Sequence, residues 1–184
     1  MGPLEQMKPW SMKGVEGVHR FLNRVYRWLC DEETGVVHAT VGDHPATVEQ
    51  QRALHQAIRK VGEDIEAMRF NTAISAMMEF LNAATRWEKI PRESASTFLL
   101  LLAPFAPHLA EELWQRMGHA ESLAHEPWPA FDEALLKLDQ VEIPVQVNGK
   151  LRGKLTIAPD AAQAAVVALA VQIPAVQQQM EGKV

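Results

Sequence analysis

The apolar residues of this sequence change their spacing once, and that change limits the folds open to the chain. Up to about residue 140 they recur every three or four positions, as on a helix with one buried face, whereas residues 142–158 alternate as in a strand. The Gly-, Asp-, Thr- and Pro-rich residues 31–45 are expected to form a loop. Helices are predicted at 14–30, 47–68, from about 71 to before Pro91, at 93–103, and from Pro107 to Gly118. The sequence therefore indicates a mainly α fold: a helical bundle followed by a small α+β domain with a β-hairpin.

The segment 93–103 is predicted to be the central helix of the bundle. It holds Phe98 and four consecutive leucines, so it is apolar on nearly every side. Pro107 suits the first turn of the next helix, where its missing N–H costs nothing. Thr47 is placed to cap the helix that follows it. The irregular stretch 120–131 is expected to lie across the surface of the bundle.

Asn148-Gly149 marks a turn between two strands. The common two-residue loop would pair Val147 with Lys150 and would mix apolar and basic residues on one face. We therefore predict a three-residue loop from Val147 to Gly149, built as a type I turn with Gly149 left-handed and a bulge beside it. In this register the basic residues of the second strand face solvent together; they are Lys150, Arg152 and Lys154.

Residues 1–138 are predicted to form the helical domain, and residues 139–184 a partial C-terminal domain. The second domain contains the hairpin at 142–158 and helices between about 160 and 181. A two-stranded hairpin with one or two helices is marginal by itself. We therefore expect this domain to be truncated before its last strands.

Composition and charge narrow the class of protein. The chain has 184 residues, of which 47% are apolar and 22% charged, as in soluble globular proteins. No apolar run is long enough to span a membrane, the N-terminus lacks a secretory pattern, and the single cysteine, Cys30, fits the reducing cytoplasm. The net charge is −5, but residues 1–29 carry five basic and two acidic side chains, and residues 142–184 carry four and three. Local basic patches decide whether phosphates can be bound, so an RNA partner stays open.

No motif for catalysis is present. The sequence contains no Gly-rich phosphate loop, no zinc-binding helix and no cysteine pair. His108 and Glu111 lie one helical turn apart, which most simply makes a surface or capping pair. No catalytic residue, metal ligand or cofactor is assigned to the chain, and it is interpreted as a binding module.

Two groups of basic residues are candidates for contact with RNA. They are the hairpin cations, Lys150, Arg152 and Lys154, and the helix arginines, Arg20, Arg24 and Arg27. The hairpin cations recur roughly every 6.5–7 Å along a strand, near the spacing of successive phosphates, although a charged edge strand that resists aggregation explains them equally well. The helix arginines lie within about 60° on one helix, where a solvated face is the simpler interpretation.

Three stretches carry a resemblance to a known family. Residues 101–114 (LLAPFAPHLAEELW), followed by Ser122 and Trp128-Pro129, resemble the anticodon-binding helical domain of class I aminoacyl-tRNA synthetases for leucine, isoleucine and valine. The N-terminal GPLE with Trp10-Ser11 and GVEG resembles bacterial leucyl-tRNA synthetases, as does VQVNGKLRGK at 145–154, which opens their small C-terminal domain. The resemblance covers almost the whole chain.

This resemblance implies a parent enzyme that joins leucine to its tRNA with ATP and Mg²⁺ and hydrolyses mischarged tRNA. The His-Ile-Gly-His and Lys-Met-Ser-Lys-Ser signatures of its catalytic core are absent here, so that core is expected upstream in the same polypeptide. The implied partners are leucine tRNA and the catalytic domain, in a monomer without membrane contact. The bundle is expected along the anticodon-stem side of the tRNA and the hairpin cations at its elbow. Two alternatives stay open: a free-standing adaptor that binds protein through its acidic middle, and a stand-alone tRNA-binding module.

Overall fold

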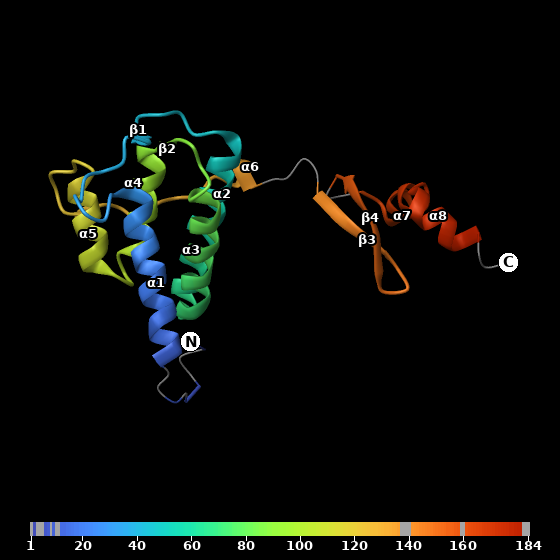
Figure 1. Ribbon diagram of the computed structural model, residues 1–184, viewed down its shortest axis with the longest axis horizontal. Coiled ribbons are helices and arrows are strands. Elements are labelled where there is room, and N and C mark those ends of the chain that lie inside the picture. Colours follow the sequence, from blue (N-terminus) through green and yellow to red (C-terminus); the bar gives the residue numbers. More distant parts are fainter. Residues whose placement is uncertain are drawn as a thin grey trace. The chain divides into compact units, whose positions relative to one another are not determined.

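The computed structural model describes residues 2, 6–7, 9, 12–136, 141–158 and 161–181. The chain divides into two compact units, Met1–Leu136 and Lys137–Val184 (Figure 1). The predicted domain boundary after residue 138 falls within 137–140, outside the described residues. Half of the N-terminal residues that carry part of the resemblance, namely 3–5, 10 and 11, also lie outside them.

Five long helices build the first unit. They are α1 (Met12–Leu29), α2 (Val48–Glu66), α3 (Phe70–Ala84), α4 (Arg92–Leu102) and α5 (Pro107–Arg116). The consecutive helices α2 and α3 pack along each other, α4 contacts α2 and α5, and α5 also contacts α1 (Figure 1). The predicted mainly helical fold is confirmed.

Helix α4 lies at the centre of this unit, as its apolar sequence predicts. Its fully buried apolar side chains are Ala95, Phe98, Leu99, Leu101 and Leu102. The Phe98 ring stacks on Phe80 of α3 at 5.0 Å between centroids and meets Trp28 of α1 edge-on at 5.6 Å. Aromatic pairs in these arrangements add to the burial of their apolar area, so the three helices are joined through one ring cluster.

Local sequence signals set two of the helix ends. Thr47 caps α2, because its Oγ1 accepts a hydrogen bond from Gln50 N at 3.2 Å while Gln50 Oε1 accepts one from Thr47 N at 2.9 Å. This reciprocal exchange satisfies two N–H groups that have no partner inside the helix. Pro107 is the first residue of α5, and Gly118 follows the last turn with a φ of 95°, a conformation that favours glycine. The predicted start and end of α5 are thus confirmed to within two residues.

The predicted loop at 31–45 contains a strand that the sequence did not reveal. Strand β1 (Val41–Gly42) pairs in parallel with β2 (Ile90–Pro91), which directly precedes α4. Ile90 N donates a hydrogen bond to Thr40 O at 2.8 Å. Two-residue strands are too short to leave an alternating pattern in a sequence. The pairing fixes the loop against the start of the central helix.

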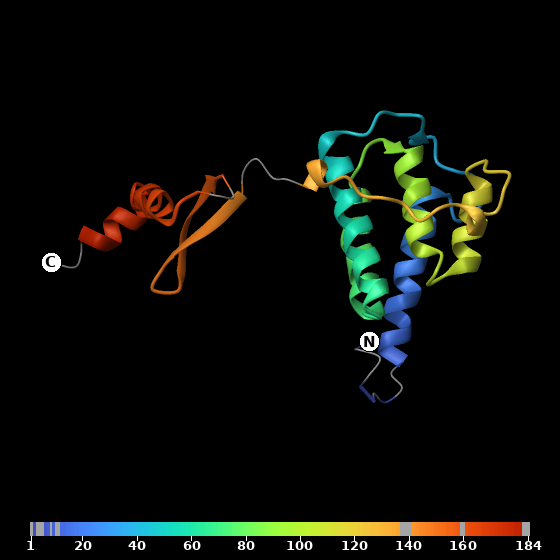
Figure 2. The ribbon, with the colours of Figure 1, turned by 180° about the vertical axis from the view of Figure 1, so that it is seen from behind.

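The irregular segment 120–131 crosses the bundle surface, as predicted (Figure 2). It begins beside α5, where Glu121 O accepts a hydrogen bond from Trp114 Nε1 at 2.8 Å, and it contains the single turn η1 (Leu123–His125). It ends beside α2, where Asp132 N donates to His55 Nδ1 at 2.9 Å. The short helix α6 (Glu133–Leu136) follows and packs on α2.

The second unit is a hairpin with two helices. Strands β3 (Val141–Val147) and β4 (Lys150–Ile157) are antiparallel, and α7 (Gln163–Val171) and α8 (Pro174–Glu181) contact β4. Within the described part of this unit, only Ile157 and Val176 are buried apolar side chains. No helix in the described ranges of the whole chain is both long and apolar enough to cross a membrane.

The predicted three-residue hairpin loop is wrong. Val147 pairs with Lys150, so the loop has two residues, and Asn148 and Gly149 have φ angles of 52° and 75°. Positive φ at both positions defines a type I′ turn, whose twist matches that of the flanking strands. The local preference of Asn-Gly for this turn therefore outweighs the hydrophobic pattern on which the three-residue loop was based.

The extra residue lies in β4 and not in the loop. Val145 pairs with Gly153 and Gln146 with Leu151, so Arg152 has no residue opposite and forms a bulge. The bulge shifts the phase of β4 by one residue partway along the strand. The side chains of β4 alternate between the two faces of the hairpin both before and after the bulge, but in opposite phase.

Candidate nucleic-acid interface

The helix arginines lie on α1, but their surroundings differ. Arg24 reaches across to α3, where its Nη2 donates a hydrogen bond to Asn82 Oδ1 at 2.8 Å. Arg27 is half-exposed and forms an ion pair with Glu32, with 3.7 Å between Nε and Oε1. Arg20 is exposed. The face thus carries one guanidinium held by a neighbouring helix and two at the solvent.

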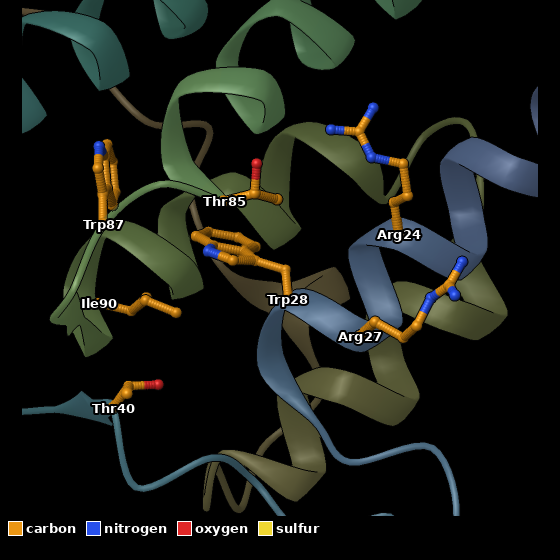
Figure 3. Close-up of a pocket in the computed structure, with 7 residues that line it drawn as sticks. All are labelled: Arg24, Arg27, Trp28, Thr40, Thr85, Trp87 and Ile90. Carbon is orange, nitrogen blue, oxygen red and sulfur yellow. The ribbon is translucent and has the colours of Figure 1, made fainter.

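Two hollows border these arginines. The first is a groove of about 600 Å³ between α1 and α3, lined by Arg20, Arg24, Ile74 and Met78 among others. The second, which we call the α1 pocket, has a volume of about 290 Å³ and lies beside the last turns of α1 (Figure 3). Its lining residues are Arg24, Arg27, Trp28, Thr40, Thr85, Trp87 and Ile90. Arg24 lines both hollows, so one surface of α1 combines cations with two hollows whose lining is partly polar and partly apolar.

The hairpin cations do not form one row, contrary to the prediction. Lys150 lies opposite Val147, and Lys154 lies opposite Pro144. Cross-strand partners share a face of the hairpin, whereas Val147 and Pro144 are an odd number of residues apart and lie on opposite faces. The bulge at Arg152 causes the difference, because it reverses the alternation between the two lysines.

The three hairpin cations also differ in charge compensation. Lys154 Nζ lies 2.6 Å from Glu142 Oε1, so an acid just before the basic stretch neutralises it. Arg152 is half-buried, and its Nε has no hydrogen-bond partner in the part of the chain that the structure describes. Lys150 is exposed and has no ion pair with any described residue. Lys150 is therefore the hairpin cation most available to a phosphate.

The sequence did not reveal the residues that surround these cations. Asn82 accepts a hydrogen bond from Arg24, and Glu142 forms an ion pair with Lys154. Trp87 lines the α1 pocket. Asn82 and Trp87 are distant from α1 in the sequence, and no spacing rule links them to Arg24. Glu142 was detectable, because it is an acid at the start of the predicted strand.

The other chemistry-bearing groups have structural roles. The described residues contain no group of three or more His, Cys, Asp and Glu side chains that is placed to hold a metal ion. Glu111 Oε2 accepts hydrogen bonds from Ser122 Oγ at 3.2 Å and Leu123 N at 3.3 Å, so it supports η1, while His108 is exposed. Burial raises the pKa of the Cys30 thiol, against the opposing charge of Arg116. A buried thiol of raised pKa is a packing group and not a nucleophile.

Comparison with known proteins identifies the family. Residues 51–168 match the family described as the anticodon-binding domain of tRNA ligase. The chain belongs to this family. The matched part of this anticodon-binding domain includes the hairpin cations and leaves α1 with its arginines outside.

Curated relatives of this anticodon-binding domain are leucine–tRNA ligases. The chain is 54% identical over 180 residues to the leucine–tRNA ligase of Rhodopirellula baltica, which covers 96% of the chain and 19% of that protein. It is 49% identical over 186 residues to the corresponding ligase of Mycobacterium ulcerans, covering 99% and 19%. The chain therefore spans about a fifth of the length of the relatives that it matches.

A solved structure resembles the same domain. It is the crystal structure of a ternary complex of the agnB2 LeuRS of Agrobacterium radiobacter K84 with tRNA and LeuAMS. The match has a TM-score of 0.66 and 30% sequence identity, and covers 94% of this chain and 23% of that one.

Proposed function

We propose that this anticodon-binding domain is the tRNA-binding part of a leucine–tRNA ligase. The observation that carries the proposal is 54% identity over 96% of the chain to a leucine–tRNA ligase. The similar solved structure, which is a complex with tRNA, supports the choice of RNA as the partner. Because the chain corresponds to about a fifth of such ligases, we assign the ATP- and Mg²⁺-dependent attachment of leucine, and editing, to other parts of the polypeptide. The parent enzyme is proposed to be cytoplasmic and monomeric.

The charged side chains of the domain are suited to contact the RNA backbone. At the hairpin they are expected to contact the backbone and not the base edges. Lys150 is exposed and uncompensated by the described residues, whereas Lys154 is held by Glu142. On α1, Arg20 and Arg27 are at the solvent, and Arg24 is fixed by Asn82. Phosphate contacts made by such side chains position an RNA without reading its sequence.

The first test is a binding titration of the chain with fluorescently labelled leucine tRNA at several salt concentrations. We expect weak binding whose affinity falls steeply as salt rises, because counterions are released from the phosphates. A tRNA for another amino acid is the control for selectivity. If neither tRNA binds at low salt, the proposed function is wrong, and the protein-binding adaptor becomes the better hypothesis.

Three hairpin variants sharpen this test. Lys150→Ala should weaken binding and lower the salt slope by about one, whereas Lys154→Ala should change less because Glu142 already offsets that charge. Glu142→Gln should release Lys154 and tighten binding. Glu49→Gln, an exposed acid on α2, makes the same change in net charge elsewhere and controls for long-range attraction. Equal tightening by both Glu variants would exclude a local role for Lys154.

A further inference from the structure

The α1 pocket contains a hydrogen-bond donor without a partner. Trp28 is 5% exposed and lines the pocket, and its Nε1 has no hydrogen-bond partner among the described residues. A buried N–H group that gave up water and gained no acceptor lowers the stability of the fold. The other buried tryptophan among the described residues, Trp114, instead donates to Glu121 O at 2.8 Å. The Trp28 ring is thus packed in the core, while its indole N–H donates no hydrogen bond to a described residue.

The position of this edge is fixed by the ring cluster behind it. The Trp28 ring meets Phe80 at 6.0 Å and Phe98 at 5.6 Å, both edge-on, and it meets Trp87 at 6.4 Å. Figure 3 shows the Trp28 ring extending from α1 between Thr85 and Ile90, with its nitrogen on the edge turned away from the two arginines. The ring cluster therefore holds the donor in place at the pocket, and a ligand reaches it once the side chains that cover this edge move aside.

The lining of the pocket selects the chemistry of such a ligand. Arg24 and Arg27 supply positive charge on the α1 side, and no carboxylate is among the lining residues. Trp87 is half-buried and offers an aromatic surface, and Thr40 and Thr85 add hydroxyl groups. Guanidinium groups bind phosphate oxygens, and flat aromatic walls suit planar rings. The volume, about 290 Å³, is near the lower end of the range for small-molecule sites.

We propose that the α1 pocket binds one nucleotide unit. Its base lies against the two tryptophans with an acceptor on Trp28 Nε1, and its phosphate lies near Arg24 and Arg27. Two sources carry these groups: a free nucleoside monophosphate, and an unstacked nucleotide of a bound RNA. The second source rests on the proposed function, and the first does not.

The indole N–H signals report directly on this site. The sequence has five tryptophans, so a chain labelled with ¹⁵N at the indoles gives five resolvable signals, and Trp28→Phe identifies the one from Trp28. Uridine and adenosine monophosphate are titrated at low salt, with ribose 5-phosphate as the control that lacks a base. We expect the Trp28 signal to move with a nucleotide and not with the sugar phosphate. Equal movement with ribose 5-phosphate would overturn the assignment of the base.

A matched pair of charge-removing variants on α1 locates the phosphate. Arg27 lines the α1 pocket, whereas the exposed Lys13 lies on the same helix and lines only the neighbouring groove. Arg27→Gln should raise the dissociation constant of the nucleotide about threefold or more, and Lys13→Gln, which removes the same charge, should leave it unchanged. Equal effects of the two variants would show that only the general charge of α1 attracts the ligand.

The same spectra with leucine tRNA separate the two sources. Movement of the Trp28 signal with tRNA but not with mononucleotides supports a nucleotide held within the RNA, and the reverse supports a free ligand. If tRNA binds in the salt titration while the Trp28 signal stays in place with every ligand, this inference is wrong and the proposed function stands. If mononucleotides move the signal and no tRNA binds, the proposed function is wrong and the pocket assignment stands.

Discussion

The two units of this protein differ in how much apolar surface they bury. In the helical unit, α4 has five apolar side chains with no exposure, and its rings join the rings of α1 and α3. In the hairpin unit, α7 is almost entirely apolar in sequence, yet Val167 is 54% and Leu169 is 42% exposed. Burial of apolar area is the main source of folding free energy. The helical unit is therefore expected to be the stable part of the chain and the hairpin unit the easily unfolded part.

The largest predicted effect tests the helical core. Phe98→Ala removes a fully buried ring and should lower the free energy of unfolding of this unit by about 4 kcal/mol. The measurement is urea unfolding followed by tryptophan fluorescence, which reports on the helical unit because all five tryptophans lie within residues 1–136. Phe131→Ala, at a 39% exposed position, is the control and should change little. A loss below about 1 kcal/mol for Phe98→Ala would contradict the central place of α4.

The next prediction concerns the hairpin unit alone. Ile157 is 7% exposed and is one of two buried apolar side chains described there, so Ile157→Ala should cost about 2–3 kcal/mol. A unit with so small a core has little stability to lose. Amide hydrogen exchange in β3 and β4 should therefore become fast, while the fluorescence midpoint in urea stays unchanged. Thr156→Ala, at an exposed neighbouring position, is the control. A shifted fluorescence midpoint would show that the units unfold together.

The helical unit also buries a charged side chain, that of Asp64. Its side chain is fully buried, with Lys60 Nζ 2.8 Å from Oδ2 and Arg69 Nε 2.8 Å from Oδ1. Burial disfavours the charged carboxylate, but hydrogen bonds from Lys60, Thr72 and Arg69 outweigh it, so the pKa of Asp64 is lowered. These contacts link the end of α2 to the start of α3.

This pKa direction predicts how stability depends on pH. Since the folded state holds the proton less tightly than the unfolded state, the stabilisation is present above the unfolded pKa of about 4 and is lost as pH falls through the folded pKa. Asp64→Asn should therefore cost about 2 kcal/mol at neutral pH, with the difference from the parent chain shrinking in acid. Urea unfolding at a series of pH values measures it. Asp43→Asn, whose side chain is 90% exposed although paired with Arg92, should cost little. A constant difference across pH would contradict the lowered pKa.

The comparison of the units also shows what sequence reasoning can reach. The helices were predictable because stripes of buried side chains repeat over several turns, and α4 was placed correctly because its second half is apolar on nearly every side. The hairpin register was not predictable, because the one extra residue can lie either in the loop or at Arg152. Both placements keep most apolar residues on one face of the hairpin. The α1 pocket was out of reach, since Trp28, Thr40 and Trp87 meet only through the tertiary fold.

The smallest prediction concerns the turn after α2. Met68 has a φ of 57°, in the left-handed region that favours glycine, and Arg69 N donates to Asp64 O at 2.7 Å while Met68 N donates to Ile65 O at 3.0 Å. These two bonds form the helix-ending motif in which glycine is usual.

Met68 is 61% exposed, so Met68→Gly removes little packing and should stabilise the helical unit by about 0.5–1 kcal/mol. The reverse change, Gly118→Ala at a φ of 95°, should destabilise it by a similar amount, although a Cβ there meets nothing within 4 Å. Both are read from the urea midpoint of tryptophan fluorescence. Stability changes of opposite sign for the two variants would establish backbone conformation as the cause, because neither substitution alters a buried contact. Stability changes of the same sign would contradict this explanation.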